Sequence, residues 1–219
     1  MAAPLAPSVR AGQALYTRSF LRAYDTVVYD INSPLTWRCP KHRLIELYNR
    51  HVSGRHLDVG VATGVLLDEC RFPTPAPDLT LMDLNPDALA SASHRLRRYA
   101  PATHRADVLQ PWGLPEGLVD SIGMAYLLHC LPGRLVDKAV VFKHARQVLR
   151  PGGTLFGATI PGIGVRHNAS ARWQLKLANR LGIMSNRNDR LADLEAALAE
   201  NFTDHEVTVA GSVALFWAR

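Results

Sequence analysis

The sequence predicts an α/β fold in which a mostly parallel β-sheet is covered by helices on both faces. Short apolar runs typical of buried strands alternate with segments of helical periodicity, which indicates parallel strands joined by crossover helices. The hinge between the last two apolar runs, at Gly211, is short, so these two strands should pair antiparallel. Ligands bind at the carboxyl ends of strands in such sheets. Functional loops are therefore expected near Val61, Leu84, Asp107, Leu127 and Ile160.

The first 51 residues are expected to form a helical cap. Apolar residues recur at helical spacing from 12 to 29 and from 42 to 51, and Ser33-Pro34 should break the pattern between them. Residues 1–22 contain Arg and Ser but no acidic side chain. We expect them to form a mobile tail leading into a helix rather than a targeting peptide.

Strands and helices alternate through the rest of the chain, residues 52–219. The expected strands are 55–61, 79–84, 104–108, 119–127, 154–160, 206–210 and 212–217. The expected helices are 63–70, 85–99, 134–149, 168–181 and 190–202. Asn85 is suited to cap a helix because Pro86 follows at the first helical position. The polar segment 184–189 either meets a substrate or is a solvated connector in which Asn186 or Asp189 caps the next helix.

Composition narrows the class of protein. The chain has 219 residues and is 47% hydrophobic, enough for one large domain with a small cap. The formal net charge is +6, but the basic residues are scattered, so a nucleic-acid partner is not expected. No apolar run is long enough for a membrane helix. Three cysteines without CxxC spacing argue against a metal site and suit a reducing cytoplasm.

The loop after the first strand carries the first chemical signal. It reads Asp58-Val59-Gly60-Val61-Ala62-Thr63-Gly64, and its small residues would let the backbone approach a ligand closely. A dinucleotide loop would have glycines at 60, 62 and 65, whereas Ala62 and Val65 stand here. The Asp58 carboxylate would repel a pyrophosphate but could hold an ammonium group. The loop therefore favours a cationic amino-acid ligand over NAD, although a plain tight turn would have similar residues.

Two further carboxylates end the next two strands. Asp83 lies about 20 residues past the glycine loop, where a carboxylate can accept both hydroxyls of a ribose. Asp107 could receive the amino group of an adenine while Val108 packs on the ring. For Asp107, a surface position in a loop is nearly as good an interpretation.

Together, these segments resemble the class I S-adenosylmethionine (SAM)-dependent methyltransferases. The resemblance covers 55–219 and rests on the segment 58–64, Asp83, Asp107, the segment 126–131 and the turn 149–153. Ala62 departs from the family pattern, where Gly is common. The resemblance implies a Rossmann-like seven-stranded sheet of order 3-2-1-4-5-7-6 with strand seven antiparallel. The SAM-binding residues it implies are Asp58, Gly60, Ala62, Gly64, Asp83, Leu84, Asp107, Val108, Tyr126 and Leu127.

Methyl transfer from SAM needs an oriented acceptor and exclusion of water, and no metal is required. His129, after strand four, is either a general base or a residue that packs beneath the loop. Tyr16 and Tyr29 of the cap are candidates for contact with a ligand, although their helical spacing also suits a core. The cap and an insert at about 162–189 are expected to form a lid, which favours a small-molecule acceptor.

The predicted activity is SAM-dependent methyl transfer to an O, N or C nucleophile of a small molecule. The cap sequence from Tyr24-Asp25 through Trp37-Arg38-Cys39-Pro40, with His56 to Gly64, also resembles a methyltransferase subgroup of bacterial and fungal natural-product pathways. One alternative is cyclisation of SAM to azetidine-2-carboxylate with release of methylthioadenosine, against which Asp58 argues because it favours a protonated amine. Two others are a SAM-assisted rearrangement and SAM binding without turnover. A homodimer through the apolar lid helices is left open.

Overall fold

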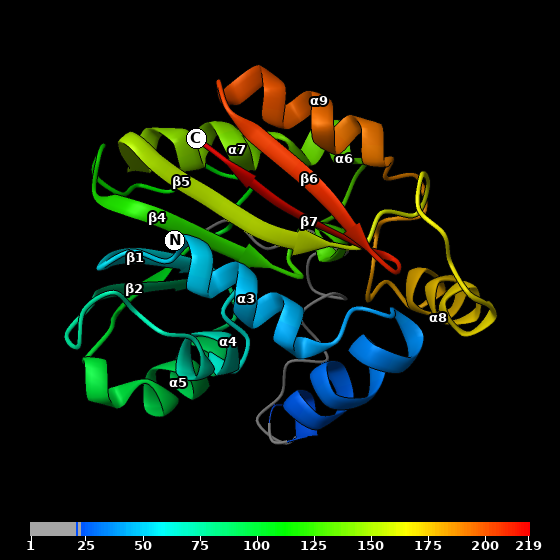
Figure 1. The fold of residues 1–219 in the computed structure, drawn as a ribbon, viewed down its shortest axis with the longest axis horizontal. Coiled ribbons are helices and arrows are strands. Elements are labelled where there is room, and N and C mark those ends of the chain that lie inside the picture. Colours follow the sequence, from blue (N-terminus) through cyan, green and yellow to red (C-terminus); the bar gives the residue numbers. More distant parts are fainter. Residues whose placement is uncertain (1–20, 22) are drawn as a thin grey trace, which may run out of the picture.

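The computed structural model describes residue 21 and residues 23–219 (Figure 1). The predicted N-terminal tail, the first half of the predicted helix 12–29 and Tyr16 lie outside these residues. The strands form one seven-stranded sheet in the order β3-β2-β1-β4-β5-β7-β6. β7 runs antiparallel to β5 and β6, and the other pairs are parallel. The predicted sheet is confirmed.

The strands lie close to their expected positions, with two differences. Their bounds are β1 Arg55–Val59, β2 Asp78–Asp83, β3 Ala102–Arg105, β4 Val119–Ala125, β5 Leu149–Thr159, β6 His205–Ala210 and β7 Val213–Ala218. β5 begins earlier than predicted because the strand runs through 151–153, where a turn was expected. Leu149 pairs with Val119, and the register shifts before Thr154 pairs with Ser121. The prediction of β3 at 104–108 was wrong. β3 is an exposed edge strand, and the apolar Val108 packs in the core beyond its end.

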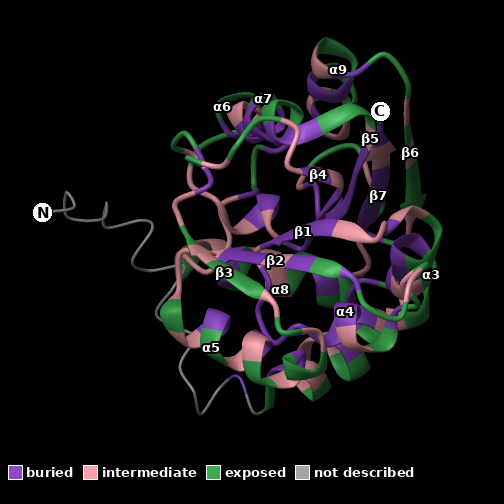
Figure 2. Cartoon of the chain, turned by 90° about the vertical axis from the view of Figure 1, so that its left-hand side faces the viewer, coloured by how far each residue is buried: buried purple, intermediate pink, exposed green. Residues whose placement is uncertain are grey.

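Helices cover both faces of the sheet around two apolar clusters (Figure 1). One layer contains α3 Lys41–His51, α4 Val65–Glu69 and α5 Pro86–Arg95, and the other contains α6 Leu135–Lys138, α7 Val140–Val148 and α9 Leu191–Asn201. Short helical turns η2 Arg97–Tyr99 and η3 Leu128–Cys130 follow α5 and β4. The helix predicted at 134–149 is divided at Ala139, whose carbonyl accepts from the Phe142 N–H. Figure 2 shows the central strands buried and β6 exposed at its edge.

The predicted break at Ser33-Pro34 was wrong, because a π-helical segment, η1 Asp25–Thr36, runs through Pro34. Its wider hydrogen-bonding pattern is visible at its end, where Trp37 N–H donates to the Asn32 carbonyl at 2.9 Å. Ser33 is fully buried and its hydroxyl bonds the Tyr126 hydroxyl at 2.8 Å. Tertiary contact therefore overrides the local tendency of proline to end a helix.

Helix α8 Ala169–Arg180 lies with η1 at the end of the molecule toward which β4 and β5 point (Figure 1). The polar sequence of the connector from α8 to α9 suggested exposure to solvent. Two of its residues are not exposed. Asn186 and Asp189 are buried, and neither caps α9 with its side chain. The Asn186 amide donates to the Ile160 carbonyl at 2.6 Å. The Asp189 carboxylate accepts from Lys138 Nζ at 2.7 Å.

The Lys138–Asp189 ion pair is buried and also reaches the connector backbone. Both side chains are almost fully shielded from solvent, and Lys138 Nζ donates to the Ser185 carbonyl at 2.6 Å as well. Removing one partner from such a pair leaves an uncompensated buried charge. The pair therefore fixes the connector against α6.

We predict that Lys138→Met and Asp189→Asn each lower the free energy of unfolding by about 3–5 kcal/mol. The double variant should lose less than the sum, because neither charge is then left alone. Urea denaturation measures this, with the exposed Lys143→Met as a control expected to change stability by less than about 0.5 kcal/mol. Strictly additive losses would show that the pair is not coupled.

Candidate active site

A cavity lies at the carboxyl ends of β1, β2 and β4, where the sequence predicts a ligand. Eight of the ten predicted SAM-binding residues line it: Gly60, Ala62, Asp83, Leu84, Asp107, Val108, Tyr126 and Leu127. The other residues that line the cavity were not predicted to bind SAM: Tyr24, Asn85, Leu109, Ala125, Cys130, Leu131 and Pro132. Tyr24 was considered only as a cap aromatic and Asn85 only as a helix cap. Most of these seven residues follow a strand, and Tyr24 belongs to the cap. These positions in the sequence were the only indication that they could lie at the site.

The glycine loop turns through left-handed backbone conformations. Gly60 and Gly64 have φ of 76° and 74°, and Ala62 has φ of 46°. Ala62 thus carries a conformation that costs a residue with Cβ about 1–2 kcal/mol. A Cβ at Gly60 would meet Leu127 Cδ1 at 2.9 Å, so glycine there lets the loops after β1 and β4 approach each other.

Two predicted residues lie behind the wall of the cavity. Gly64 precedes α4, and a Cβ there would meet Ala92 of α5 at 3.2 Å, so its place in the structure is in helix packing. Asp58 is buried, and its Oδ1 accepts from the Tyr48 hydroxyl at 2.8 Å. His56 Nε2 lies 3.6 Å from the same oxygen. Asp58 is therefore engaged beneath the loop rather than in the lining.

Asp83 occupies the end of β2 in a cradle of backbone amides. Its Oδ1 accepts from the Asn85 N–H at 2.8 Å, and the nearby backbone amides of Val61, Ala62 and Leu84 favour the ionised carboxylate. Burial nevertheless raises the pKa of Asp83 to about 6, because desolvation outweighs these bonds. Asn85 accepts from the Asp87 and Ala88 amides, which confirms the predicted cap of α5.

Asp107 and Val108 lie in the loop that follows β3. Asp107 Oδ1 accepts from the Leu109 N–H at 3.0 Å, which fixes the turn beside the cavity. Val108 is buried and its carbonyl accepts from the Trp112 indole. The pair therefore offers a carboxylate next to an apolar surface.

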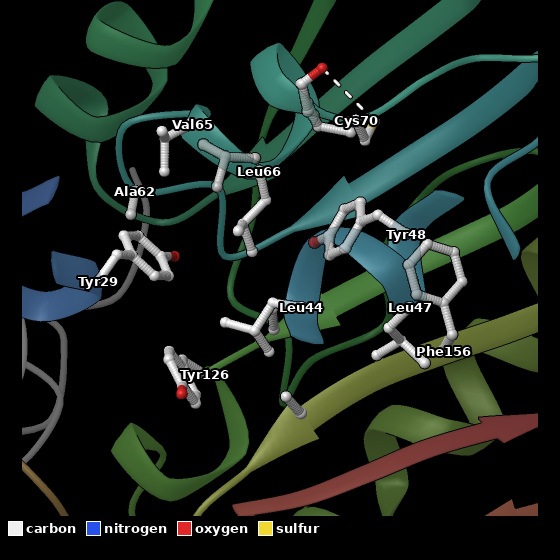
Figure 3. Packing of buried hydrophobic residues seen from close by; sticks show 14 of the residues in the cluster. Tyr29, Leu44, Leu47, Tyr48, Ala62, Val65, Leu66, Cys70, Tyr126 and Phe156 are labelled. Carbon is white, nitrogen blue, oxygen red and sulfur yellow. Dashed lines mark hydrogen bonds between the residues drawn. The ribbon is translucent and has the colours of Figure 1, made fainter. Parts of the chain in front are cut away.

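Tyr126 separates the first cavity from a second one. It has a left-handed φ of 60°, its N–H donates to the Ala158 carbonyl at 2.7 Å, and its hydroxyl bonds Ser33. Tyr29 stacks on it with ring centroids 6.1 Å apart. Figure 3 shows Tyr29 near Ala62 and Tyr126 within the buried cluster. Tyr29 lines neither cavity, so the structure places it in packing behind Tyr126.

The second cavity has a volume of about 390 Å³ and is largely apolar. It shares Tyr24, Tyr126 and Cys130 with the first cavity, so the two adjoin. Its other lining residues come from η1, β5, the α8 region and the turn after β4: Val27, Val28, Asn32, Trp37, His129, Ile160, Trp173, Gln174, Leu177, Ala178, Leu181, Ile183 and Met184. Arg166, His167 and Asn168, which follow β5, do not line it.

His129 is buried between the second cavity and the end of β5. Its Nδ1 accepts from the Ile160 N–H at 3.3 Å, and its carbonyl accepts from the Ser185 N–H at 2.8 Å. Burial, and then the nearby Lys138 charge, lower the pKa of His129 to about 3. The imidazole is therefore neutral at physiological pH.

An acidic residue of η1 ties this segment to the glycine loop. Asp25 Oδ1 accepts from the Thr63 hydroxyl at 2.5 Å. Its Oδ2 accepts from Arg95 of α5, also at 2.5 Å. The wall of the second cavity is therefore joined to the loop that borders the first.

The sheet order and the cavity at the strand ends define a Rossmann-like α/β protein. Comparison with known proteins narrows the class. A family described as a methyltransferase domain matches residues 57–155. The chain is 43% identical to the demethylluteothin O-methyltransferase of Streptomyces thioluteus, over 94% of this chain and 90% of that protein. It is 39% identical to the physcion biosynthesis cluster O-methyltransferase of Aspergillus chevalieri, over 98% and 96%.

Solved structures agree on the fold. A DhpI complex with SAM and HEP superposes with a TM-score of 0.66 at 16% identity, covering 99% of this chain and 100% of that one. The chain belongs to the SAM-dependent methyltransferases, as its motifs predicted. It is an enzyme that transfers a methyl group from SAM.

Two features of the described residues bear on other classes of partner. No helix among residues 21 and 23–219 is both long and apolar enough to span a membrane. Within the same residues, no group of three His, Cys, Asp or Glu side chains is arranged to hold a metal ion.

We predict that Gly60→Ala destabilises the protein by more than Gly113→Ala does. Both glycines have left-handed φ, of 76° and 65°, so both substitutions incur about 1–2 kcal/mol of backbone strain. Only Gly60 has a close neighbour, whereas a Cβ at Gly113 would meet nothing within 4 Å. Urea denaturation measures the free energy of unfolding of both variants, and the difference between their losses reports the contact with Leu127. Equal losses would contradict the close approach of the two loops.

Proposed function

We propose that the enzyme methylates an oxygen of a small hydrophobic acceptor made in natural-product biosynthesis. The observation that carries the proposal is the pair of adjoining cavities, one at the strand ends and one with apolar walls. Two relatives are named O-methyltransferases, and their names refer to demethylluteothin and to physcion biosynthesis. The acceptor cavity is then the second one, whose volume suits a small ring system.

SAM would bind in the first cavity through the eight predicted residues that line it. Asp83 and Leu84 are proposed to hold the ribose, since the Asp83 carboxylate faces the cavity from the end of β2. Asp107 and Val108 are proposed to hold the adenine. Bound SAM supplies a methyl group on a positively charged sulfur, and Tyr126, which borders both cavities, would separate its nucleoside side from the acceptor.

The protein's part in the reaction is orientation and exclusion of water. η1 and the insert 162–189 are proposed to act as a lid, because both contribute to the acceptor cavity. Exposed Trp173, Leu177 and Leu181 of the α8 region also line that cavity and offer apolar surface to an incoming acceptor.

Three free cysteines support a reducing, cytoplasmic location.

The proposal is tested by an acceptor screen. Purified enzyme is incubated with SAM and hydroxylated ring compounds, and S-adenosylhomocysteine is quantified by mass spectrometry. We expect enzyme-dependent product with apolar ring acceptors and no release of methylthioadenosine. SAM binding without product from any oxygen, nitrogen or carbon acceptor would overturn the proposal.

We predict that Asp83→Asn weakens SAM binding by at least tenfold in calorimetry, because a charge-assisted hydrogen bond is worth about 1.5–3 kcal/mol. Asp78→Asn is a matched control, since Asp78 is exposed at the opposite end of the same strand. Unchanged affinity in Asp83→Asn would remove Asp83 from the site.

The pH dependence of SAM binding follows from the same residue. The ribose hydroxyls donate more strongly to an ionised carboxylate than to a protonated one, and the pKa of Asp83 is about 6 before binding. Affinity should therefore be full above pH 7 and fall as pH decreases through 6. The Asp83→Asn variant should lack this dependence. An identical decline in variant and parent would assign the dependence to another group.

A further inference from the structure

We propose that His129 donates a hydrogen bond to the acceptor oxygen rather than taking its proton, and that the acceptor is an acidic enol or phenol bound as its anion. This inference rests on the proposed function and specifies its substrate class. It replaces the general-base role that the sequence suggested for His129.

The hydrogen bond at Nδ1 determines where the His129 proton lies. The Ile160 N–H, at 3.3 Å, can only donate, so Nδ1 must present its lone pair. A neutral imidazole has one N–H, which is therefore on Nε2. Nε2 makes no hydrogen bond to the described residues, and His129 lines the acceptor cavity. A nitrogen that already carries a proton cannot remove another one.

The surrounding groups hold this tautomer and oppose protonation of the ring. The carbonyl of His129 is held by Ser185, whose own carbonyl accepts from Lys138. Asn186 anchors the carbonyl of Ile160, whose N–H meets the ring. The Lys138 ammonium disfavours a second positive charge nearby, which agrees with the lowered pKa of His129.

The other groups that face His129 offer no base. The Tyr126 ring lies against it, with centroids 5.6 Å apart, and burial raises the pKa of Tyr126. Thr159 Oγ1 lies 3.5 Å from Nδ1, and the Cys130 thiol donates to the Tyr126 carbonyl. Asp189 is paired with Lys138.

The lining of the acceptor cavity extends this conclusion from the neighbours of His129 to the rest of that cavity. Its titratable side chains among the described residues are Tyr24, Tyr126, His129 and Cys130, and none is a carboxylate. Residues 1–20 and 22 contain no Asp, Glu or His. An acceptor hydroxyl with the acidity of an ordinary phenol, pKa about 10, would thus keep its proton at neutral pH. Efficient turnover requires an acceptor that ionises in water.

The reaction then balances without an enzyme base. The acceptor loses its O–H proton to solvent before binding. A lone pair of the oxyanion forms the bond to the methyl carbon, the carbon–sulfur bond breaks, and its electron pair remains on sulfur. An anion and a sulfonium become two neutral groups. The His129 Nε2–H orients the oxyanion through a charge-assisted hydrogen bond.

The test uses a ring that yields S-adenosylhomocysteine in the acceptor screen, with fluorinated analogues that change hydroxyl acidity and hardly change size. We expect kcat/KM to rise with pH up to the pKa of each acceptor and then level off, so that the kinetic pKa shifts with the acceptor. A single kinetic pKa shared by all analogues would overturn the inference and indicate an enzyme base. Absence of product with every acceptor would overturn the proposed function first, and this inference with it.

Two substitutions separate donation from proton removal. His129→Gln places an amide N–H near the position of Nε2, whereas His129→Leu has no donor, and both lose the acceptor for Ile160. Above the acceptor pKa, we expect the Leu variant to be about 10–100-fold slower in kcat than the Gln variant, with equal SAM affinity. Equal losses of about 10²–10⁴-fold in both would support a general base instead.

Discussion

The backbone turns that end β1 and β4 are the constraint on which the site depends. Gly60 and Tyr126 both adopt left-handed conformations, and the side chain of Leu127 lies where a Cβ at Gly60 would have to go. This contact brings the two loops together, and both border the first cavity. The strain at Tyr126 is offset by its bonds to Ala158 and Ser33.

The acceptor side of the site is attached to this frame by buried polar contacts. Ser33 bonds Tyr126, while Asp25 joins η1 to the glycine loop. On the opposite wall, the Lys138–Asp189 pair fixes the connector after α8. Such pairs are costly to desolvate and contribute mainly when their geometry is good. Their placement here explains how a largely apolar cavity can still hold His129 in one orientation.

Much of the fold could be predicted because its signals are local. The buried strand β7 is a continuous apolar run, and the Asn85 cap lies within its own turn. β3 could not be placed accurately, since an edge strand needs no continuous apolar run. The motifs predicted most of the residues that line the first cavity. They did not indicate that Asp58 accepts a hydrogen bond from the Tyr48 hydroxyl. The burial of Asp189 depends on Lys138, 51 residues away, and the His129 tautomer on Ile160, 31 residues away.

In the proposed function, SAM and acceptor occupy the two cavities that meet at Tyr126. A crystal structure with S-adenosylhomocysteine and a methylated product tests it most directly. We expect the ribose at Asp83, the adenine beside Val108, and the product oxygen within hydrogen-bonding distance of His129 Nε2. A nucleoside bound away from Asp83, or a product outside the cavity that His129 lines, would contradict it.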